Sequence, residues 1–309
     1  MGNSPKKKEG LNYTLVTEFL LLGFQNCQIF NIMLFMLFLA IYILTLNVNL
    51  LIIVLVGNAP NLNSPMYFFL SQLSLSDILL TTNITPNLLH IIINAGSKIS
   101  FEGCITQFYF HGALNAVECL LLTVMSYDRY LAICDPLVYT STMEPRHCLK
   151  LVLCSWFSGF MAMLIFVFLL CHLQFCGPYV IDHYFCDLGP LLELSCSDYT
   201  FLKITQFALA IPFALVPFLC IFSTYLKIII TIIGIASTNR KQKAFSTCSS
   251  HLIVVCMYYG ILTIVYIVPS KGQSFNINKI LSILYTIGIP FFNPIIYSLR
   301  NQEIRTAKH

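Results

Sequence analysis

The chain has 309 residues, of which 57% are hydrophobic and only 10% are charged, and its mean hydropathy is +0.79. A soluble globular domain carries about 25% charged residues, so this composition excludes a soluble protein and indicates an integral membrane protein. The net charge of +4 is too small to suggest a nucleic-acid partner, and no basic-aromatic nucleic-acid motif is present.

Seven apolar segments are long enough to cross a bilayer, which takes roughly 20 residues. They are continuous apolar runs without the alternation of a β-barrel, so we expect an all-α bundle of seven transmembrane helices. The spans run over residues 31–56, 65–90, 101–130, 148–172, 201–231, 244–268 and 277–298. Residues 1–30 would form a leading tail, residues 31–298 the membrane domain, and residues 299–309 a short basic tail that lies along the membrane as an amphipathic helix.

The distribution of Lys and Arg favours a cytoplasmic C-terminus and therefore an extracellular N-terminus. An N-glycosylation acceptor at Asn12, in the sequence Asn-Tyr-Thr, agrees with this orientation. The first ten residues are polar and basic, unlike a cleavable signal peptide. The first span is therefore expected to direct membrane insertion itself.

Two carboxylic acids lie in the middle of predicted spans, Asp77 in the second and Glu118 in the third. Ionisable groups at this depth are costly, and they face the bundle interior or water. They form either a protonated pair of purely structural value or a shared site for a cation or proton that joins the two helices. Both interpretations stay open at this point.

The third span carries a polar stripe from its outer to its inner end. His111, Asn115, Glu118 and Arg129 share one broad helical face, since the eleven residues from Glu118 to Arg129 make about three turns. At the inner end the sequence MSYDRYLAICDP places Asp128 beside Arg129. Such a stripe could connect an outer cavity with an inner switch, although a His or Asn there is as often simply hydrogen-bonded packing.

Of the 13 cysteines, four lie at the outer side of the predicted bundle. Cys104 is at the outer end of the third span, and Cys176, Cys186 and Cys196 lie in the loop over residues 173–203. An extracellular loop is oxidising, which favours disulfides over free thiols, but the spacing does not determine the connectivity. A bond from this loop to the third span would hold a lid over the mouth of the bundle.

Five prolines predict bends in the spans, because proline removes a helical hydrogen bond. Bent helices leave room for a central cavity. In the seventh span the amide of Asn293 can satisfy backbone groups that Pro294 frees. The five are Pro86, Pro212, Pro217, Pro290 and Pro294.

Four long motifs in order give the chain a family resemblance. They are PMYFFLSQLSLSD (residues 65–77), MSYDRYLAICDPLVY (125–139), KAFSTCSSHL (243–252) and NPIIYSLRN (293–301). With these motifs and the loop cysteines, essentially the whole chain resembles a tetrapod-type (class II) olfactory receptor of the rhodopsin-like G-protein-coupled receptors. The resemblance implies a multi-pass plasma-membrane glycoprotein of sensory cilia, without enzymatic activity.

The resemblance implies an odorant-binding cavity among the outer halves of the third, fifth and sixth helices. Binding there would activate a stimulatory, olfactory-type heterotrimeric G protein and raise cAMP. The matching side chains are apolar with a few hydrogen-bonding groups, which favours a small, neutral, largely apolar volatile ligand. These positions are His111, Gly112, Asn115, Ala116, Leu209, Ala210, Phe213, Tyr259, Tyr266 and Ser270.

The resemblance also assigns roles to the remaining motifs. Arg129 would be held by Asp128 at rest and released on activation to accept the G protein. The matching switch positions are Asp128, Arg129, Tyr130, Tyr225, Lys243, His251, Asn293, Pro294 and Tyr297. The implied disulfides are Cys104–Cys186 and Cys176–Cys196, and the implied sodium site comprises Asn49, Asp77, Glu118 and Asn293.

Some positions depart from the family pattern. Asp135 precedes Pro136 where the family usually carries His or Asn, and the first inner loop, residues 57–64, has no Lys or Arg. Both departures bear on G-protein contact rather than on the fold. A transporter or ion channel that uses Asp77 and Glu118 is the alternative, but it predicts repeats or a polar path that the sequence lacks.

Overall fold

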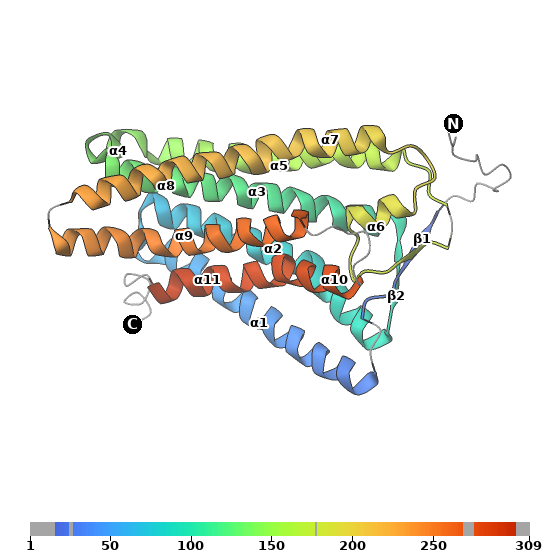
Figure 1. Ribbon diagram of the computed structural model, residues 1–309. Helices are drawn as coiled ribbons and strands as arrows, with labels where there is room; N and C mark the ends of the chain where they lie inside the picture. The colour runs from blue at the N-terminus through green and yellow to red at the C-terminus, as the bar shows by residue number, and fades with distance from the viewer. Residues whose placement is uncertain (1–15, 25–26, 177, 236, 268–274, 301–309) are drawn as a thin grey trace.

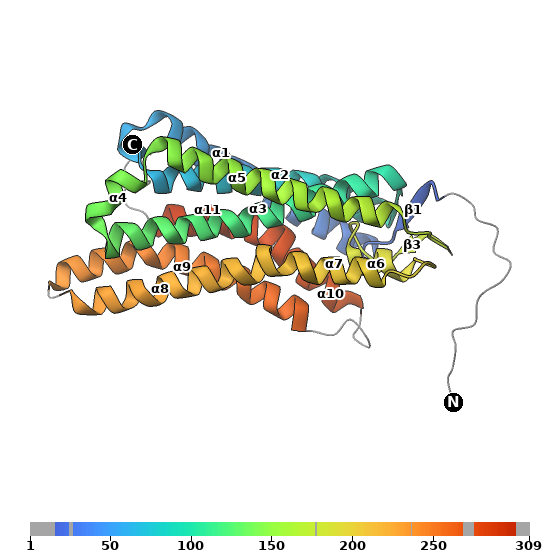
Figure 2. The ribbon, with the colours of Figure 1, turned by 90° about the horizontal axis from the view of Figure 1, so that it is seen from above.

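The computed structural model describes residues 16–24, 27–176, 178–235, 237–267 and 275–300. Its long helices lie side by side in one elongated bundle, with β1 and the end of α11 at opposite ends (Figures 1 and 2). All seven predicted spans are helical. The bundle comprises α1 (Gln28–Asn58), α2 (Pro65–Asn94), α3 (Phe101–Cys134), α5 (Pro145–Cys171), α7 (Thr200–Ala210) with α8 (Val216–Gly234), α9 (Thr238–Ile267), and α10 (Phe275–Ile283) with α11 (Ile289–Arg300).

Two of the seven spans are interrupted by π-helical turns. The turn η2 (Ile211–Leu215) joins α7 to α8, and η3 (Leu284–Gly288) joins α10 to α11. Pro212 lies in η2, so the expected irregularity at this proline takes the form of a wider turn rather than a break. Single π-helical turns occur mostly inside α-helices and frequently at functional sites.

Five helical segments within the described residues are long and apolar enough to cross a membrane. They are α1, α3, α5, the α7–α8 segment and residues 279–298, while α9 contributes the shorter apolar stretch Cys248–Ile264. The 30 residues of α2 also suffice in length. Its hydropathy is lower because it carries polar residues such as Ser74, Asp77 and Thr81, which are buried. α2 therefore turns a polar face toward its neighbours.

The central helix of the bundle is α3. It packs against α2, α5 and α8, and it runs between the other helices in both views (Figures 1 and 2). Its first turn is capped by Ser100, whose hydroxyl accepts a hydrogen bond from the Gly103 backbone N–H at 3.1 Å. Gly159 of α5 allows close approach, since a Cβ there would lie 3.0 Å from the Ala113 carbonyl oxygen. The polar stripe of α3 is thus enclosed by the bundle.

The helical bundle carries a small β-sheet at its outer end. Three short strands, β1 (Glu18–Leu21), β2 (Ser97–Ser100) and β3 (Val180–Ile181), form a sheet in the order β2-β1-β3. β1 pairs antiparallel with β2 and parallel with β3. Phe19 and Leu21 are buried on one face of β1. The part of the predicted leading tail that the structure describes is therefore packed onto the bundle.

The loop over residues 173–203 is held by both disulfides that the family resemblance implies. Cys104 of α3 is bonded to Cys186, and Cys176 is bonded to Cys196 within the loop. A short helix, α6 (Leu188–Glu193), follows Cys186, and Asp187 caps it by accepting a hydrogen bond from the Leu188 N–H at 2.8 Å. At the inner end, α4 (Pro136–Thr142) follows α3, and the 3-10 turn η1 (Pro60–Leu62) follows α1. The spans did not predict these three short elements.

Candidate functional site: a polar axis through the bundle

The outer part of the site lies under the lid segment, which we define as residues 182–186. The ring of Phe185 lies 5.1 Å from that of His111 on α3, and the His111 ring lies 5.6 Å from that of Tyr285 in η3. The Tyr184 hydroxyl is hydrogen bonded to the Thr286 hydroxyl at 3.0 Å. The lid segment therefore inserts aromatic rings between α3 and η3, directly above the candidate ligand residue His111.

The candidate ligand residues that the structure describes lie on facing sides of the bundle. His111 is buried and Asn115 half-buried, and the Asn115 amide donates to the His111 carbonyl at 2.7 Å. Tyr259 of α9 is buried, and its hydroxyl lacks a hydrogen-bond partner among the described residues. Three further candidate ligand residues lie on α7 and η2, where they are half-buried among exposed neighbours. These are Leu209, Ala210 and Phe213. Ala116 of α3 is also half-buried.

Gly112 differs from the expectation for a ligand-lining residue. A Cβ at this position would lie 2.4 Å from Cε of Met163 on α5. The open side of Gly112 therefore faces α5, and the methionine occupies the space that a side chain would fill. Gly112 therefore allows α3 and α5 to pack closely and does not line a ligand cavity on this side.

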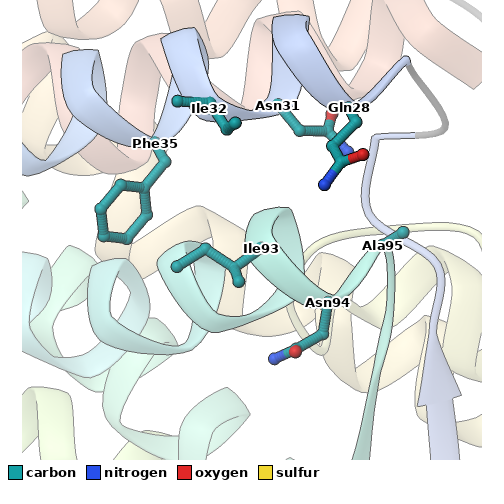
Figure 3. Close-up of a pocket in the computed structure, with 7 residues that line it drawn as sticks. All are labelled: Gln28, Asn31, Ile32, Phe35, Ile93, Asn94 and Ala95. Carbon is teal, nitrogen blue, oxygen red and sulfur yellow. The ribbon is translucent and has the colours of Figure 1, made fainter.

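A cavity of about 540 Å³ lies elsewhere, between the outer ends of α1 and α2 (Figure 3). None of the predicted ligand residues lines it. Its walls are Gln28, Asn31, Ile32, Phe35, Ile93, Asn94 and Ala95. Several of these side chains are exposed on the outside of the bundle, so this hollow is distinct from the predicted odorant site under the lid segment.

The middle of the axis is a buried oxygen-rich cluster. The Asn293 amide donates to both carboxylate oxygens of Asp77, at 3.2 and 3.3 Å, and Glu118 lies within hydrogen-bonding range of Asp77. Asn49 donates to the Pro290 carbonyl at 3.2 Å, which ties α1 to α11. The structure thus brings together Asp77, Glu118 and Asn293 from three helices, and Asn49 contacts α11 three residues before Asn293.

The donor set of this cluster fits a hard monovalent cation. One side-chain oxygen each of Asn49, Glu118 and Asn293 is buried without a hydrogen-bond partner in the described part of the chain. With Asp77 these are all oxygen ligands, which hard cations prefer. Within the described residues no cluster of three His, Cys, Asp or Glu suits a transition metal. The cluster therefore suits sodium better than zinc.

The inner end of the axis is the ion pair of Asp128 and Arg129. Nε of Arg129 donates to Asp128 Oδ2 at 2.9 Å, and Nη2 pairs with the same oxygen. The other carboxylate oxygen accepts a hydrogen bond from the Tyr139 hydroxyl of α4 at 3.0 Å. Asp128 is fully buried. Burial and the nearby carboxylate raise the pKa of Tyr139 above its ordinary value, which keeps this hydroxyl a donor.

The tyrosines expected near Arg129 have other surroundings in this arrangement. Tyr225 of α8 is hydrogen bonded through its hydroxyl to Nδ1 of His251 on α9, at 2.6 Å. Tyr297 of α11 is fully buried, and its hydroxyl lacks a partner among the described residues. Tyr130 lies under the ammonium group of Lys227, 5.4 Å from the ring centre. In this structure Arg129 is thus paired with Asp128, while the Tyr225 hydroxyl is paired with His251.

Several predicted positions lie outside what the structure describes. Asn12, Ser270 and residues 301–309 of the amphipathic tail predicted over residues 299–309 are among these positions, and the side chains of Lys243 and Tyr266 are not described either. Pro294 lies inside α11, one residue after Asn293.

Comparison with known proteins now gives the family. A family model described as olfactory receptor matches residues 38–308. Olfactory receptor 6P1 of Homo sapiens is 45% identical over 292 residues, which cover 94% of this chain and 92% of the relative. The chain belongs to the olfactory receptor family. Olfactory receptor 5P55 of Mus musculus is 44% identical over 299 residues, covering 97% and 96%, and olfactory receptor 226 of Rattus norvegicus is 44% identical over 296, covering 94% and 90%.

The fold of this olfactory receptor family member is that of rhodopsin. Squid rhodopsin superposes with a TM-score of 0.73 over 92% of this chain and 85% of its own, at 15% sequence identity. The predicted seven-helix receptor fold is therefore confirmed, and the family is one of receptors rather than enzymes. None of these relatives supports the alternative of a transporter or channel.

Sequence reasoning missed several residues that complete the axis. Tyr139 holds the second oxygen of Asp128, although it lies within the quoted MSYDRYLAICDPLVY motif. Tyr258 of α9 donates to the Asn115 carbonyl at 3.1 Å and contacts the thiol of Cys119 at 3.1 Å. Tyr139 follows Asp128 by eleven residues, so its place in the motif could have indicated the contact. No sequence signal indicated Tyr258, because its partners are 139 and 143 residues away.

Proposed function

We propose that this protein is an odorant receptor that couples to a stimulatory, olfactory-type G protein. An odorant bound beneath the lid segment would shift the helices, release Arg129 from Asp128 and open the inner end of the bundle. The G protein would then raise cAMP. The observation that carries this proposal is the buried Asp128–Arg129 ion pair at the inner end of α3, in a chain of the olfactory receptor family.

The ion pair has the properties that a two-state switch requires. The Asp128 carboxylate is satisfied by Arg129 and Tyr139 together, so releasing the arginine leaves it with a weaker partner set. Breaking a buried pair is costly, which holds the resting state until another interaction offsets the cost. Ligand contacts at the outer end and G-protein contacts at the inner end are two sites that bias one equilibrium.

The ligand would be a small, neutral and mostly apolar volatile. Leu209, Ala210 and Phe213 offer apolar area, and His111, Asn115 and Tyr259 offer hydrogen bonds that fix orientation. Tyr266 and Ser270 belong to the same proposed wall. Gly112 and Ala116 would contribute through the close packing of α3 rather than through polar contacts.

A sodium ion is proposed at the middle of the axis. Asp77 and Glu118 would supply its charge partners, and the free oxygens of Asn49 and Asn293 would complete the set. When bound, the cation would balance the charge of one of the two carboxylates, and a proton on the other carboxyl would leave the site neutral. The chain's own contribution would be side-chain oxygens from four helices.

The proposed topology places residues 1–30 outside, residues 31–298 across the plasma membrane of sensory cilia, and residues 299–309 in the cytoplasm. The glycosylation acceptor sequence at Asn12 and both disulfides accord with an extracellular outer end. The inner end, with Arg129, Lys243 and Tyr297 near it, would meet the G protein.

A cAMP assay in transfected cells tests this function. Cells carrying the native chain, Arg129→Ala or the control Arg146→Ala, which removes an exposed arginine at the start of α5, would be screened with diverse volatiles at matched surface staining. We expect a ligand-dependent rise that Arg129→Ala abolishes and Arg146→Ala retains. Silence of the native chain across a broad panel, or a response that Arg129→Ala leaves intact, would contradict the proposal.

A further inference from the structure

Lys279 of α10 is a buried cation at the outer end of the bundle. Its side chain is 3% exposed, its Nζ lies 2.5 Å from Oδ1 of Asp182, and it donates to the Gly23 carbonyl at 2.8 Å. An ammonium group withdrawn from water persists only if it is paired and hydrogen bonded, and both conditions are met here. Lys279 thus joins three segments that are far apart in sequence: α10, the lid segment and the chain after β1.

The lid segment leads from this pair to the candidate ligand residues. Asp182 precedes His183, which is buried with its ring 4.7 Å from the rings of Tyr184 and Phe185. Phe185 in turn lies against His111, and Tyr184 is hydrogen bonded to Thr286. Phe185, which covers His111, therefore lies only three residues after Asp182, the partner of Lys279. We call the rings of Tyr184 and Phe185 the roof of the site.

The two sides of the lid segment are held differently. On the α3 side, Cys186 is bonded to Cys104, and its N–H donates to Oε1 of Gln107 at 3.0 Å. On the side of α10 and η3, the links include the Lys279–Asp182 ion pair, the Tyr184–Thr286 hydrogen bond and a ring contact of Phe185 with Tyr285 at 6.5 Å. The His183 carbonyl also accepts a hydrogen bond from the Gly23 N–H at 3.1 Å. The α3 side is thus held by a covalent bond, whereas the side of α10 and η3 is held by non-covalent contacts that can break and re-form.

We infer that Lys279 is a positioning residue for ligand binding: through Asp182 it fixes the outer end of α10 against the lid segment, so that Tyr184 and Phe185 close over the ligand. This inference rests on the proposed odorant-receptor function. Lys279 does not touch the ligand, because His183 and the rings beyond it lie between them. Its loss opens the roof, which speeds ligand release and leaves the Asp128–Arg129 switch unchanged.

The experiment compares Lys279→Met, Asp182→Asn, their double variant and the conservative Lys279→Arg in the cAMP assay. Each single loss is expected to raise the half-maximal concentration of a volatile agonist about tenfold, while the maximal response stays the same. The double variant should be no worse than either single variant, because the two residues act as one unit. Lys279→Arg should recover most of the potency.

The chain offers a matched control in the exposed ion pair between Lys98 and Glu18, with an N···O distance of 3.1 Å and side chains 74% and 54% exposed. Lys98→Met breaks a pair of the same kind on the same outer surface and should leave potency unchanged. Unchanged potency in both Lys279→Met and Asp182→Asn at normal surface levels would overturn the inference. Loss of surface staining in both would make the pair a folding element and would equally overturn it.

A second readout needs no ligand. Backbone hydrogen exchange over residues 180–186 of the purified full chain should be faster in Lys279→Met than in the native protein or Lys98→Met. Faster exchange in a chain that answers no volatile would mean that the receptor proposal fails while the lid contact stands. Unchanged exchange means that Lys279 does not hold the lid segment, whatever the chain binds.

Discussion

The two ends of the bundle each hold an aspartate–cation pair, but the pairs are built in opposite ways. At the inner end Asp128 and Arg129 are neighbours on α3, one residue apart. At the outer end Asp182 and Lys279 are 97 residues apart and come from a loop and a helix. The inner pair therefore needs only α3 to be folded, whereas the outer pair forms only when the lid segment and α10 are in contact.

This difference suits each end to its proposed task. A pair within one helix survives movements of the other helices, so its opening depends on what approaches Arg129. A pair between two segments opens whenever those segments separate. We accordingly propose that the inner pair is the switch that the G protein reads, and that the outer pair holds the lid segment over the ligand site.

The largest effect is expected from removing the covalent side of the lid segment. Cys104→Ser breaks the bond to Cys186, and loss of a native disulfide typically costs about 2–5 kcal/mol of stability. We expect surface staining to fall strongly. The control Cys154→Ser removes an exposed free thiol of α5 and should stay at the native level. Normal staining of Cys104→Ser would show that the non-covalent contacts alone hold the lid segment.

A smaller effect is expected at the inner pair from Tyr139→Phe. This variant removes the 3.0 Å hydrogen bond to Asp128 Oδ1, and hydrogen bonds to charged groups are worth about 1.5–3 kcal/mol. Without Tyr139 the Asp128 carboxylate depends on Arg129 alone, so releasing the arginine costs more and ligand-independent cAMP should fall. Tyr42→Phe is the control, since its exposed hydroxyl makes only a 3.4 Å contact with Thr82. Equal basal cAMP in the two variants would remove Tyr139 from the switch.

The sequence predicted the inner end better than the outer end, and the reason is the range of the interactions. Asp128, Arg129 and the seven apolar spans are local patterns that a helix places by its own geometry. No local sequence pattern singles out Lys279. Its burial depends on Asp182 and Gly23, which no periodicity connects to α10.

Short strands were missed for a related reason. β1 has four residues and pairs with segments about 80 and 160 positions away, so its alternation of buried and exposed side chains is too brief to stand out beside an apolar span. The candidate cation site was predicted only in part. The family resemblance named its four residues, but the Asn293–Asp77 hydrogen bond and the buried oxygens without a partner among the described residues are features of the folded bundle.

The smallest effect concerns His183 in the lid segment. Burial, followed by the charge of Lys279 and the proximity of His111, lowers the pKa of His183 from 6.5 to about 3. The folded protein therefore keeps this ring neutral, and the unfolded chain binds a proton below pH 6.5. The resulting stability is present above pH 6.5 and is lost as pH falls toward 3.

Thermal unfolding of the purified protein measures this pH dependence. Between pH 7 and pH 6 the contribution of His183 should fall by less than about 1 kcal/mol. His183→Phe keeps the ring contacts and should show a shallower decline of the unfolding temperature over that range. Identical slopes for the native and His183→Phe proteins would mean that His183 is not held neutral.

The central claim is that Asp128 restrains Arg129, and recruitment of a stimulatory G protein without ligand tests it most directly. Energy transfer between the receptor and the Gα subunit would be measured for the native chain, Asp128→Asn and Asp128→Asn with Arg129→Ala, at matched surface levels. The account predicts several-fold higher recruitment for Asp128→Asn and a return to baseline in the double variant. Native-level recruitment by Asp128→Asn, or raised recruitment that persists without Arg129, would contradict it.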